Sequence, residues 1–105
     1  MIPLNITTVQ DEKDLGLIKN FMLDQPQFYP GHKEWIDGKC SSRIEKGIYK
    51  PIIAISDGII VGNVIYHCLP NERVEIKNFR IDEKYRSRDL GHFLLTQAEV
   101  ESQST

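Results

Sequence analysis

The chain has 105 residues, 40% of them apolar and 27% charged, and a formal net charge of −2 at pH 7. This length allows one domain with a single modest core, and the slightly acidic balance argues against a general nucleic-acid partner, which would require a basic surface. No stretch approaches the roughly 20 apolar residues of a membrane span, and residues 1–5 lack the features of a signal peptide. Cys40 and Cys68 have no zinc-type spacing. We therefore expect a cytoplasmic protein with free thiols, no metal and no membrane partner.

The first half of the chain predicts a strand followed by two helices. Residues 4–9 contain β-branched residues with some alternation, which is typical of a strand. A helix is predicted after the candidate N-cap Asp11, with an apolar face made of Leu15, Ile18 and Met22. The stretch QPQFYPG at residues 25–31 ends that helix.

A second helix is predicted over residues 32–46. Its apolar residues share one face, on which we place Trp35, Ile36, Cys40 and Ile44. Gly47 is expected to close this helix in the left-handed conformation that favours glycine.

The second half predicts three strands and a last helix. Asp57-Gly58 lies between two apolar runs, and this is the strongest short-range hairpin signal in the sequence. Pro70-Asn71 makes a second turn, after which a strand is expected over residues 73–81. The last helix is predicted over residues 89–101, with four residues facing inward: Leu90, Phe93, Leu94 and Ala98.

A short basic loop joins the strand over residues 73–81 to the last helix. The loop contains Arg86 and Arg88 and opens directly into the helix. A helix N-terminus offers unpaired backbone N–H groups and a positive dipole end, and two guanidinium groups add to them. This combination suits a phosphate group, although two solvated loop charges are the alternative.

This strand–loop–helix segment resembles the acetyl-CoA-binding motif of the GNAT N-acetyltransferase superfamily. That motif runs from a hydrophobic-x-hydrophobic strand, here Phe79 and Ile81, into a loop of the form Arg/Gln-x-x-Gly-x-Gly/Ala, here Arg86, Asp89 and Gly91. The resemblance implies an α+β fold with a mostly antiparallel sheet and the order β-α-α-β-β-β-α. It is specific over residues 50–101, the central strands and the cofactor motif, whereas residues 1–49, the acceptor side, match in element order alone.

Because GNAT domains continue beyond this helix, residues 1–105 are expected to form a single truncated domain that lacks the C-terminal strands. The resemblance implies that the main chain of Phe79, Arg80 and Ile81 pairs with the pantetheine amides of acetyl-CoA. The pyrophosphate is expected on the loop and first helical turn, formed by Arg86, Ser87, Arg88, Asp89, Leu90, Gly91 and His92. For Phe79, Ile81 and Gly91 a packing role is the alternative and is compatible with the cofactor role.

Asp89 departs from the family pattern, because it occupies the place of the first loop glycine. A carboxylate about 5 Å from a phosphate charge, at an effective dielectric near 20, costs about 3 kcal/mol. Aspartate at a helix N-terminus stabilises the fold by about 1 kcal/mol, which is less than this penalty. We expect weakened coenzyme A binding that Asp89→Gly restores.

Glu75 is the candidate catalytic residue. In one branch of the superfamily a glutamate at this register removes a proton from the acceptor amine, and such a base benefits from a raised pKa. The alternative is an exposed strand glutamate paired with Lys77 or Arg73. Four residues border the acceptor side in this family and are interpreted mainly as core and rim packing: Phe28, Tyr29, His32 and Trp35. The adjacent His67 and Cys68 point to opposite faces of a strand and are not expected to pair.

The resemblance therefore implies transfer of an acetyl group from acetyl-CoA to a primary amine on a small molecule or peptide. The alternatives are a non-catalytic or degenerate module with the same fold, and an inactive fragment of a longer acetyltransferase. The strand over residues 73–81 would form an exposed sheet edge, so a homodimer through that edge is also expected.

Overall fold

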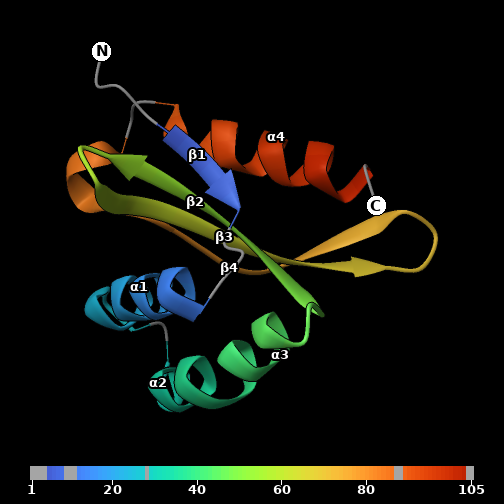
Figure 1. Cartoon of the computed structure of the whole chain (residues 1–105), viewed down its shortest axis with the longest axis horizontal. Coiled ribbons are helices and arrows are strands. Elements are labelled where there is room, and N and C mark those ends of the chain that lie inside the picture. Colours follow the sequence, from blue (N-terminus) through green and yellow to red (C-terminus); the bar gives the residue numbers. More distant parts are fainter. Residues whose placement is uncertain (1–4, 9–11, 28, 87–88, 104–105) are drawn as a thin grey trace.

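The computed structural model describes residues 5–8, 12–27, 29–86 and 89–103. One antiparallel sheet has the strand order β1-β2-β3-β4, with β1 at Asn5–Thr8, β2 at Tyr49–Ser56, β3 at Ile59–Leu69 and β4 at Arg73–Ile81. Helices α1 (Glu12–Asp24), α2 (His32–Trp35) and α3 (Ser41–Glu45) cover one face of this sheet, and α4 (Leu90–Gln103) covers the other (Figure 1). The element order and the antiparallel sheet agree with the prediction.

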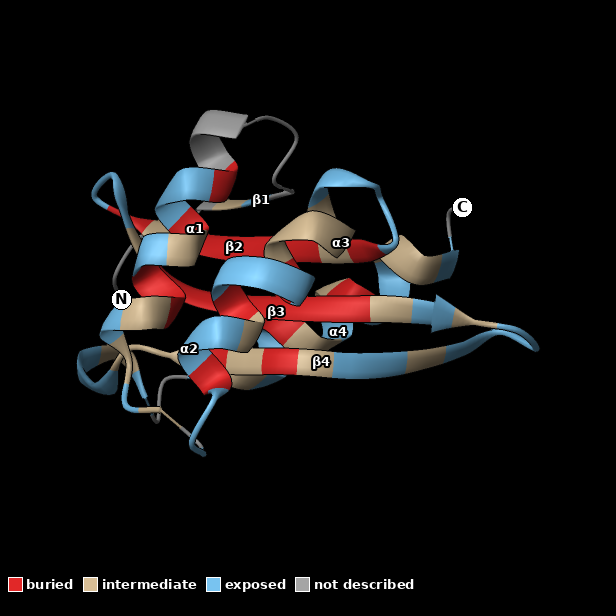
Figure 2. Cartoon of the chain, turned by 90° about the horizontal axis from the view of Figure 1, so that it is seen from below, coloured by how far each residue is buried: buried red, intermediate tan, exposed pale blue. Residues whose placement is uncertain are grey.

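The core beneath α1 forms because apolar residues recur at helical spacing and meet inward-facing strand residues. Leu15, Ile18 and Met22, predicted as the apolar face of the first helix, are all buried. They share one cluster with further residues of the helices and strands, namely Phe21, Ile36, Cys40, Tyr49, Ile53 and Ile65. Figure 2 shows this buried band along β2 and β3, beneath the helices.

A second core lies between the sheet and α4. Leu90, Leu94 and Ala98 are buried at spacings of four residues and pack on the opposite face of the strands. Phe93 was predicted to face inward and this was wrong, because its side chain is 49% exposed. Leu95, on the other flank of the buried stripe, packs against the cluster, so the sheet covers that flank of α4 and not the flank of Phe93.

Both predicted turns of the hairpins are present. Asp57 and Gly58 have φ of 52° and 77°, which are the two positive φ values that a type I′ hairpin turn requires. Asn71 and Glu72 also have positive φ in the second turn. The strand over residues 73–81 is found with its predicted bounds.

The helical backbone over residues 32–45 agrees with the predicted second helix but contains a π-helical segment, Ile36–Cys40. The Ser41 hydroxyl and amide both donate to the Ile36 carbonyl, the hydroxyl at 2.7 Å. This wide turn, with the weak helix former Gly38 inside it, brings both Ile36 and Cys40 into the core. Gly47 ends the helix as predicted, with φ 75°.

A β-bulge in β4 decides which side chains reach each face of the sheet. Ile65 pairs with Asn78 and Tyr66 pairs with Ile76, so Lys77 is the extra residue. The bulge reverses the alternation along the strand. As a result Val74 before it and Phe79 after it both pack toward α4, while Lys77 and Asn78 both face the side of α1–α3.

Candidate functional site

The connection between β4 and α4 starts with a single 3₁₀ turn, Glu83–Tyr85, which the sequence did not predict. The Asp82 carboxylate caps this turn by accepting a hydrogen bond from the Lys84 amide at 3.0 Å. The Tyr85 amide then donates to the Asp82 carbonyl at 2.8 Å. The chain leaving β4 is therefore held in a defined direction before it reaches Arg86.

Arg86 folds back onto the end of β4. Its Nε donates to the Ile81 carbonyl at 3.2 Å, which leaves the rest of its planar guanidinium fork available for further bonds. Ser87 and Arg88, also predicted to contact the cofactor, lie outside the described residues. The expectation that Arg86 and Arg88 both bind the phosphate therefore remains a prediction.

Asp89 has the backbone conformation that glycine favours. Its φ is 58°, in the left-handed region that aspartate tolerates better than most residues. The Phe93 amide donates to the Asp89 carbonyl at 3.0 Å, which is the first bond of α4 among the residues that the structure describes. The amides of Leu90, Gly91 and His92 precede that bond, so they are the amides that a helix leaves without partners inside itself.

Gly91 lies against the ring of Phe79 of β4. A Cβ added at Gly91 would stand 3.0 Å from Cζ of Phe79, so the ring would have to shift to accommodate a larger residue. Phe79, Ile81 and Leu90 all pack in the core under α4. Because these side chains are packed, the main chain of β4 is the part that could contact a ligand. His92 is exposed in the first turn of α4.

Arg80 was singled out for its backbone alone, but its side chain is buried on the opposite face of the sheet. Its exposure is 8%, and its guanidinium donates to the Pro26 carbonyl. Burial, with a smaller contribution from the Arg86 charge, lowers the pKa of Arg80. A buried cation cannot be read from a strand pattern, since its partner lies 54 residues away in sequence.

His32 lies beside Arg80 in a buried polar cluster that also contains Asn63 and Asn78. Its pKa is lowered, first by burial and then by the Arg80 charge, so the imidazole is neutral near pH 7. Its ring contacts those of Tyr29 and Trp35, with centroids 4.9 and 5.7 Å away. Phe28, predicted in the same group, is outside the described residues.

Glu75 lies at the other end of β4, six residues or about 20 Å from Ile81. Its side chain is 46% exposed and bonded to Lys77 at 3.1 Å, with His67 Nδ1 at 3.7 Å. The hydrogen bond from Lys77 is the main cause that lowers the pKa of Glu75. The expectation of a raised pKa was wrong, whereas the assignment of Glu75 as the base stays a prediction.

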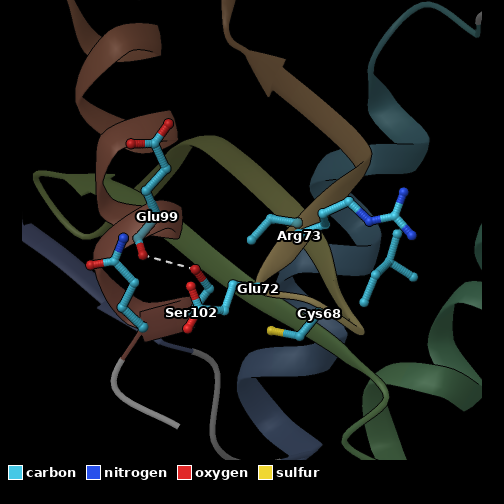
Figure 3. A pocket seen from close by; sticks show the side chains of 8 residues that line it. Cys68, Glu72, Arg73, Glu99 and Ser102 are labelled. Atoms are coloured by element: carbon cyan, nitrogen blue, oxygen red, sulfur yellow. Dashed lines mark hydrogen bonds between the residues drawn. The ribbon is translucent and has the colours of Figure 1, made fainter.

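A cavity of about 830 Å³ opens at the far end of α4, between that helix and the β3–β4 hairpin (Figure 3). Its lining includes Cys68, Glu72, Arg73 and Ser102, whose hydroxyl donates to the Glu99 carbonyl. Cys68 is an exposed free thiol, and His67 turns to Glu75 instead. None of the residues proposed for cofactor binding lines this cavity.

Neither a metal site nor a membrane span is found in the part of the chain that the structure describes. Within it, no three His, Cys, Asp or Glu side chains gather where they could hold a metal ion. No described helix has both the length and the apolar character needed to cross a bilayer. The other thiol, Cys40, is buried, and burial raises its pKa to about 12.

No protein-family model matches the sequence, and no curated protein matches it either. Solved structures do match in shape, among them the GNAT family N-acetyltransferase YhbS from Escherichia coli in complex with CoA, with TM-score 0.75 and 17% identity. That match covers 99% of this chain and 58% of YhbS.

Two further matches are a ribosomal-protein-alanine N-acetyltransferase from Brucella melitensis and AAC(6')-Iy in complex with a bisubstrate analogue, CoA-S-monomethyl-acetylneamine. The first has TM-score 0.75 and 13% identity, with 97% of this chain and 73% of that chain covered. The second has TM-score 0.72 and 14% identity, with 97% and 72% covered. The β1–β4 sheet with α4 on one face and α1–α3 on the other is therefore the fold of the GNAT N-acetyltransferases.

Proposed function

We propose that this chain binds acetyl-CoA at the turn between β4 and α4 and transfers its acetyl group to a primary amine. The observation that carries the proposal is the start of α4. The amides of Leu90, Gly91 and His92 precede the bond from the Phe93 amide to the Asp89 carbonyl, and Gly91 lies against the ring of Phe79 of β4.

The charges near this turn favour an anion. Three helix-terminal amides and the dipole of α4 give a positive end to which a phosphate binds well. Arg86 is anchored beside it through its bond to Ile81.

The outer edge of β4 offers main-chain groups to the rest of the cofactor. Among the described strands β4 pairs with β3 alone, so its other edge presents N–H and C=O groups. In the proposed complex the pantetheine amides pair with Phe79, Arg80 and Ile81 in the manner of an added strand. An extended ligand with alternating amide groups is suited to such an edge.

The proposed reaction is direct attack of a neutral amine on the thioester carbonyl. The C–N bond forms and a tetrahedral intermediate collapses with cleavage of the C–S bond. The amine loses one proton to a base, and the coenzyme A thiolate leaves. Glu75 is the proposed base, in spite of its lowered pKa, because it is the carboxylate that lies on β4 itself. The fold contributes mainly by holding both reactants in place.

Calorimetric titration with acetyl-CoA tests the binding half of the proposal, with Arg86→Gln and Lys84→Gln as a matched pair. Both variants remove one exposed positive charge from the same turn. Loss of a charge-assisted bond to phosphate typically weakens binding by about 10- to 100-fold. We expect that loss for Arg86→Gln and little change for Lys84→Gln. Absence of heat with the unmodified chain at millimolar acetyl-CoA would refute the proposal.

The transfer half needs a direct measurement of product. Mass spectrometry of mixtures with polyamines, aminoglycosides and peptides detects an added acetyl group without a thiol reagent, which the exposed Cys68 would consume. Glu75→Gln should reduce the rate while leaving acetyl-CoA binding intact. Equal rates for Glu75→Gln and the unmodified protein would mean that Glu75 is not the base, without contradicting acetyl-CoA binding or acetyl transfer.

A second candidate is a non-catalytic module that keeps the fold. Two observations favour it, namely the Asp89 carboxylate at the start of α4 and the ion-paired state of Glu75. Acetyl-CoA binding without any acetylated product across the amine panel would support this alternative.

A further inference from the structure

β4 carries two different sets of side chains on its two faces. Phe79 and Ile81 pack into the apolar core beneath α4. Asn78 and Arg80, between and beside them in sequence, are buried on the opposite face, toward α1 and α2. A displacement of the β4 backbone therefore reaches packed groups on both sides of the sheet, because protein interiors have little free space to absorb it.

Arg80 connects β4 to the segment between α1 and α2, residues 25–31. Its Nη2 donates to the Pro26 carbonyl, directly after the C-terminus of α1. The same segment is tied to α1 by Gln27, whose Nε2 donates to the Met22 and Leu23 carbonyls at 3.4 and 3.3 Å. Residues 25–31 are thus bonded both to α1, through Gln27, and to β4, through Arg80.

A second connection runs parallel to the first. Asn63 of β3 donates to Asn78 Oδ1 at 3.1 Å, and Asn78 Nδ2 lies 3.5 Å from His32 Nε2. The His32 ring is stacked on that of Trp35, with 20° between the ring planes. Trp35 is the single tryptophan of the chain, so its emission reports on α2.

We propose that Arg80 is a positioning residue that holds the 25–31 segment against β4 and transmits cofactor binding on β4 to the α2 side of the sheet. The inference rests on the proposed function for its second part. In the proposed complex the acceptor amine lies on the α2 side of β4, away from the side that Phe79 and Ile81 fill. Arg80 then connects β4, which would hold acetyl-CoA, to residues 25–31, which would border the amine.

Arginine is suited to this position because its guanidinium remains charged when buried and donates in several directions. A cation also interacts favourably with the carbonyl-rich C-terminal end of α1. Lysine keeps the charge but loses the planar fork, so Arg80→Lys should restore part of the connection. Glutamine is polar but uncharged, so Arg80→Gln should not restore the connection.

Amide hydrogen exchange on the free protein tests the first part of the proposal. In Arg80→Gln we expect exchange of amides in residues 25–35 to rise about tenfold or more, with Arg80→Lys intermediate. Arg73→Gln removes the same charge from the exposed start of the same strand and should leave these amides unchanged. Unchanged exchange over 25–35 in Arg80→Gln overturns the proposal, and so does an equal rise in β2 and β3, which would mean a general loss of stability.

If Arg80→Gln does not fold, Arg80→Lys decides the first part by the same criterion. A rise confined to residues 25–35 upholds the positioning role, and no rise removes it. This measurement needs no ligand, so its outcome is independent of whether the chain binds acetyl-CoA.

Parallel calorimetry and Trp35 fluorescence test the second part during titration with acetyl-CoA. In the unmodified protein the emission should change along the binding curve. In Arg80→Gln or Arg80→Lys the emission change at saturating acetyl-CoA should be lost or reduced, and calorimetry on the same variant gives the concentration that saturates it. Heat without an emission change in the unmodified protein overturns the transmission and leaves the proposed function intact. Absence of heat refutes the proposed function, and with it the transmission of cofactor binding.

Discussion

The two faces of β4 are stabilised in different ways. Toward α4 the strand presents Phe79 and Ile81 to a core of apolar residues, whose stability depends on shape and volume. Toward α2 it presents Asn78 and Arg80 to a cluster held by hydrogen bonds, whose stability depends on protonation and bond geometry. The first face fixes where α4 begins, and the second fixes the segment between α1 and α2. One strand therefore has an apolar face whose stability depends on packing and a polar face whose stability depends on pH.

The largest effect is expected from a cavity on the apolar face. Leu94 is fully buried, and removal of a buried leucine side chain costs about 2–5 kcal/mol. Leu94→Ala should lower the free energy of unfolding by about 3 kcal/mol in urea titrations. Phe93→Ala on the same helix should cost less than about 1 kcal/mol, since Phe93 is half exposed. Similar losses for both variants would mean that the Phe93 flank of α4 is covered in solution.

Asp89→Gly tests the charge at the start of α4. Removing the carboxylate should improve acetyl-CoA affinity by up to about two decades, the equivalent of about 3 kcal/mol between like charges. Asp57→Gly is the matched control, because Asp57 also has positive φ, 52° against 58°, but lies in the hairpin turn. The stability of both variants should stay within about 1 kcal/mol of the unmodified protein, because relief of the positive φ opposes the loss of aspartate and the entropic cost of glycine. Asp89→Gly alone should gain affinity. Equal calorimetric affinities for Asp89→Gly and the unmodified protein would contradict the electrostatic penalty.

Overpacking at Gly62 of β3 should give the third largest effect. A Cβ there would meet Ile81 Cδ1 at 2.9 Å, Leu94 Cδ1 at 3.1 Å and the Arg80 carbonyl at 3.2 Å. Forcing extra volume into such a site costs about 1–3 kcal/mol, so Gly62→Ala should melt several degrees lower. Gly16→Ala in α1 meets nothing within 4 Å and should stabilise the helix by up to about 1 kcal/mol. A neutral Gly62→Ala would show that the apolar face is looser than its contacts indicate.

The smallest effect concerns pH and the polar face. Burial, then Arg80, lowers the pKa of His32 in the folded state, so the unfolded chain, with an ordinary histidine pKa near 6.5, binds protons more readily. Stability should therefore fall as the pH drops below about 6.5, by at most about 1.4 kcal/mol per pH unit from this group. The loss ends below the folded-state pKa. Urea unfolding at several pH values should show this slope in the unmodified protein and not in His32→Gln, and identical slopes would refute it.

Local sequence determined the helices, strands and turns. Asp57-Gly58 required a turn because both residues accept positive φ, and the apolar spacing of Leu15, Ile18 and Met22 required a helix with a buried face. The strand–loop–helix pattern of residues 73–101 predicted the fold through its resemblance to the GNAT motif, and the phosphate site suggested at the same turn stays a prediction. These features depend on residues a few positions apart, and their energetics are visible in a single window of sequence.

The tertiary structure decided the environment of residues whose contacts are distant in sequence. The burial of Arg80 depends on a carbonyl 54 residues away, and the contact between Asn78 and His32 joins residues that are 46 apart in sequence. Phe93 is exposed because the sheet covers the other flank of α4. The bulge at Lys77 reverses the alternation of β4, and its position follows from the pairing with β3. Sequence alone leaves such residues ambiguous, because their environment is supplied by parts of the chain that meet only on folding.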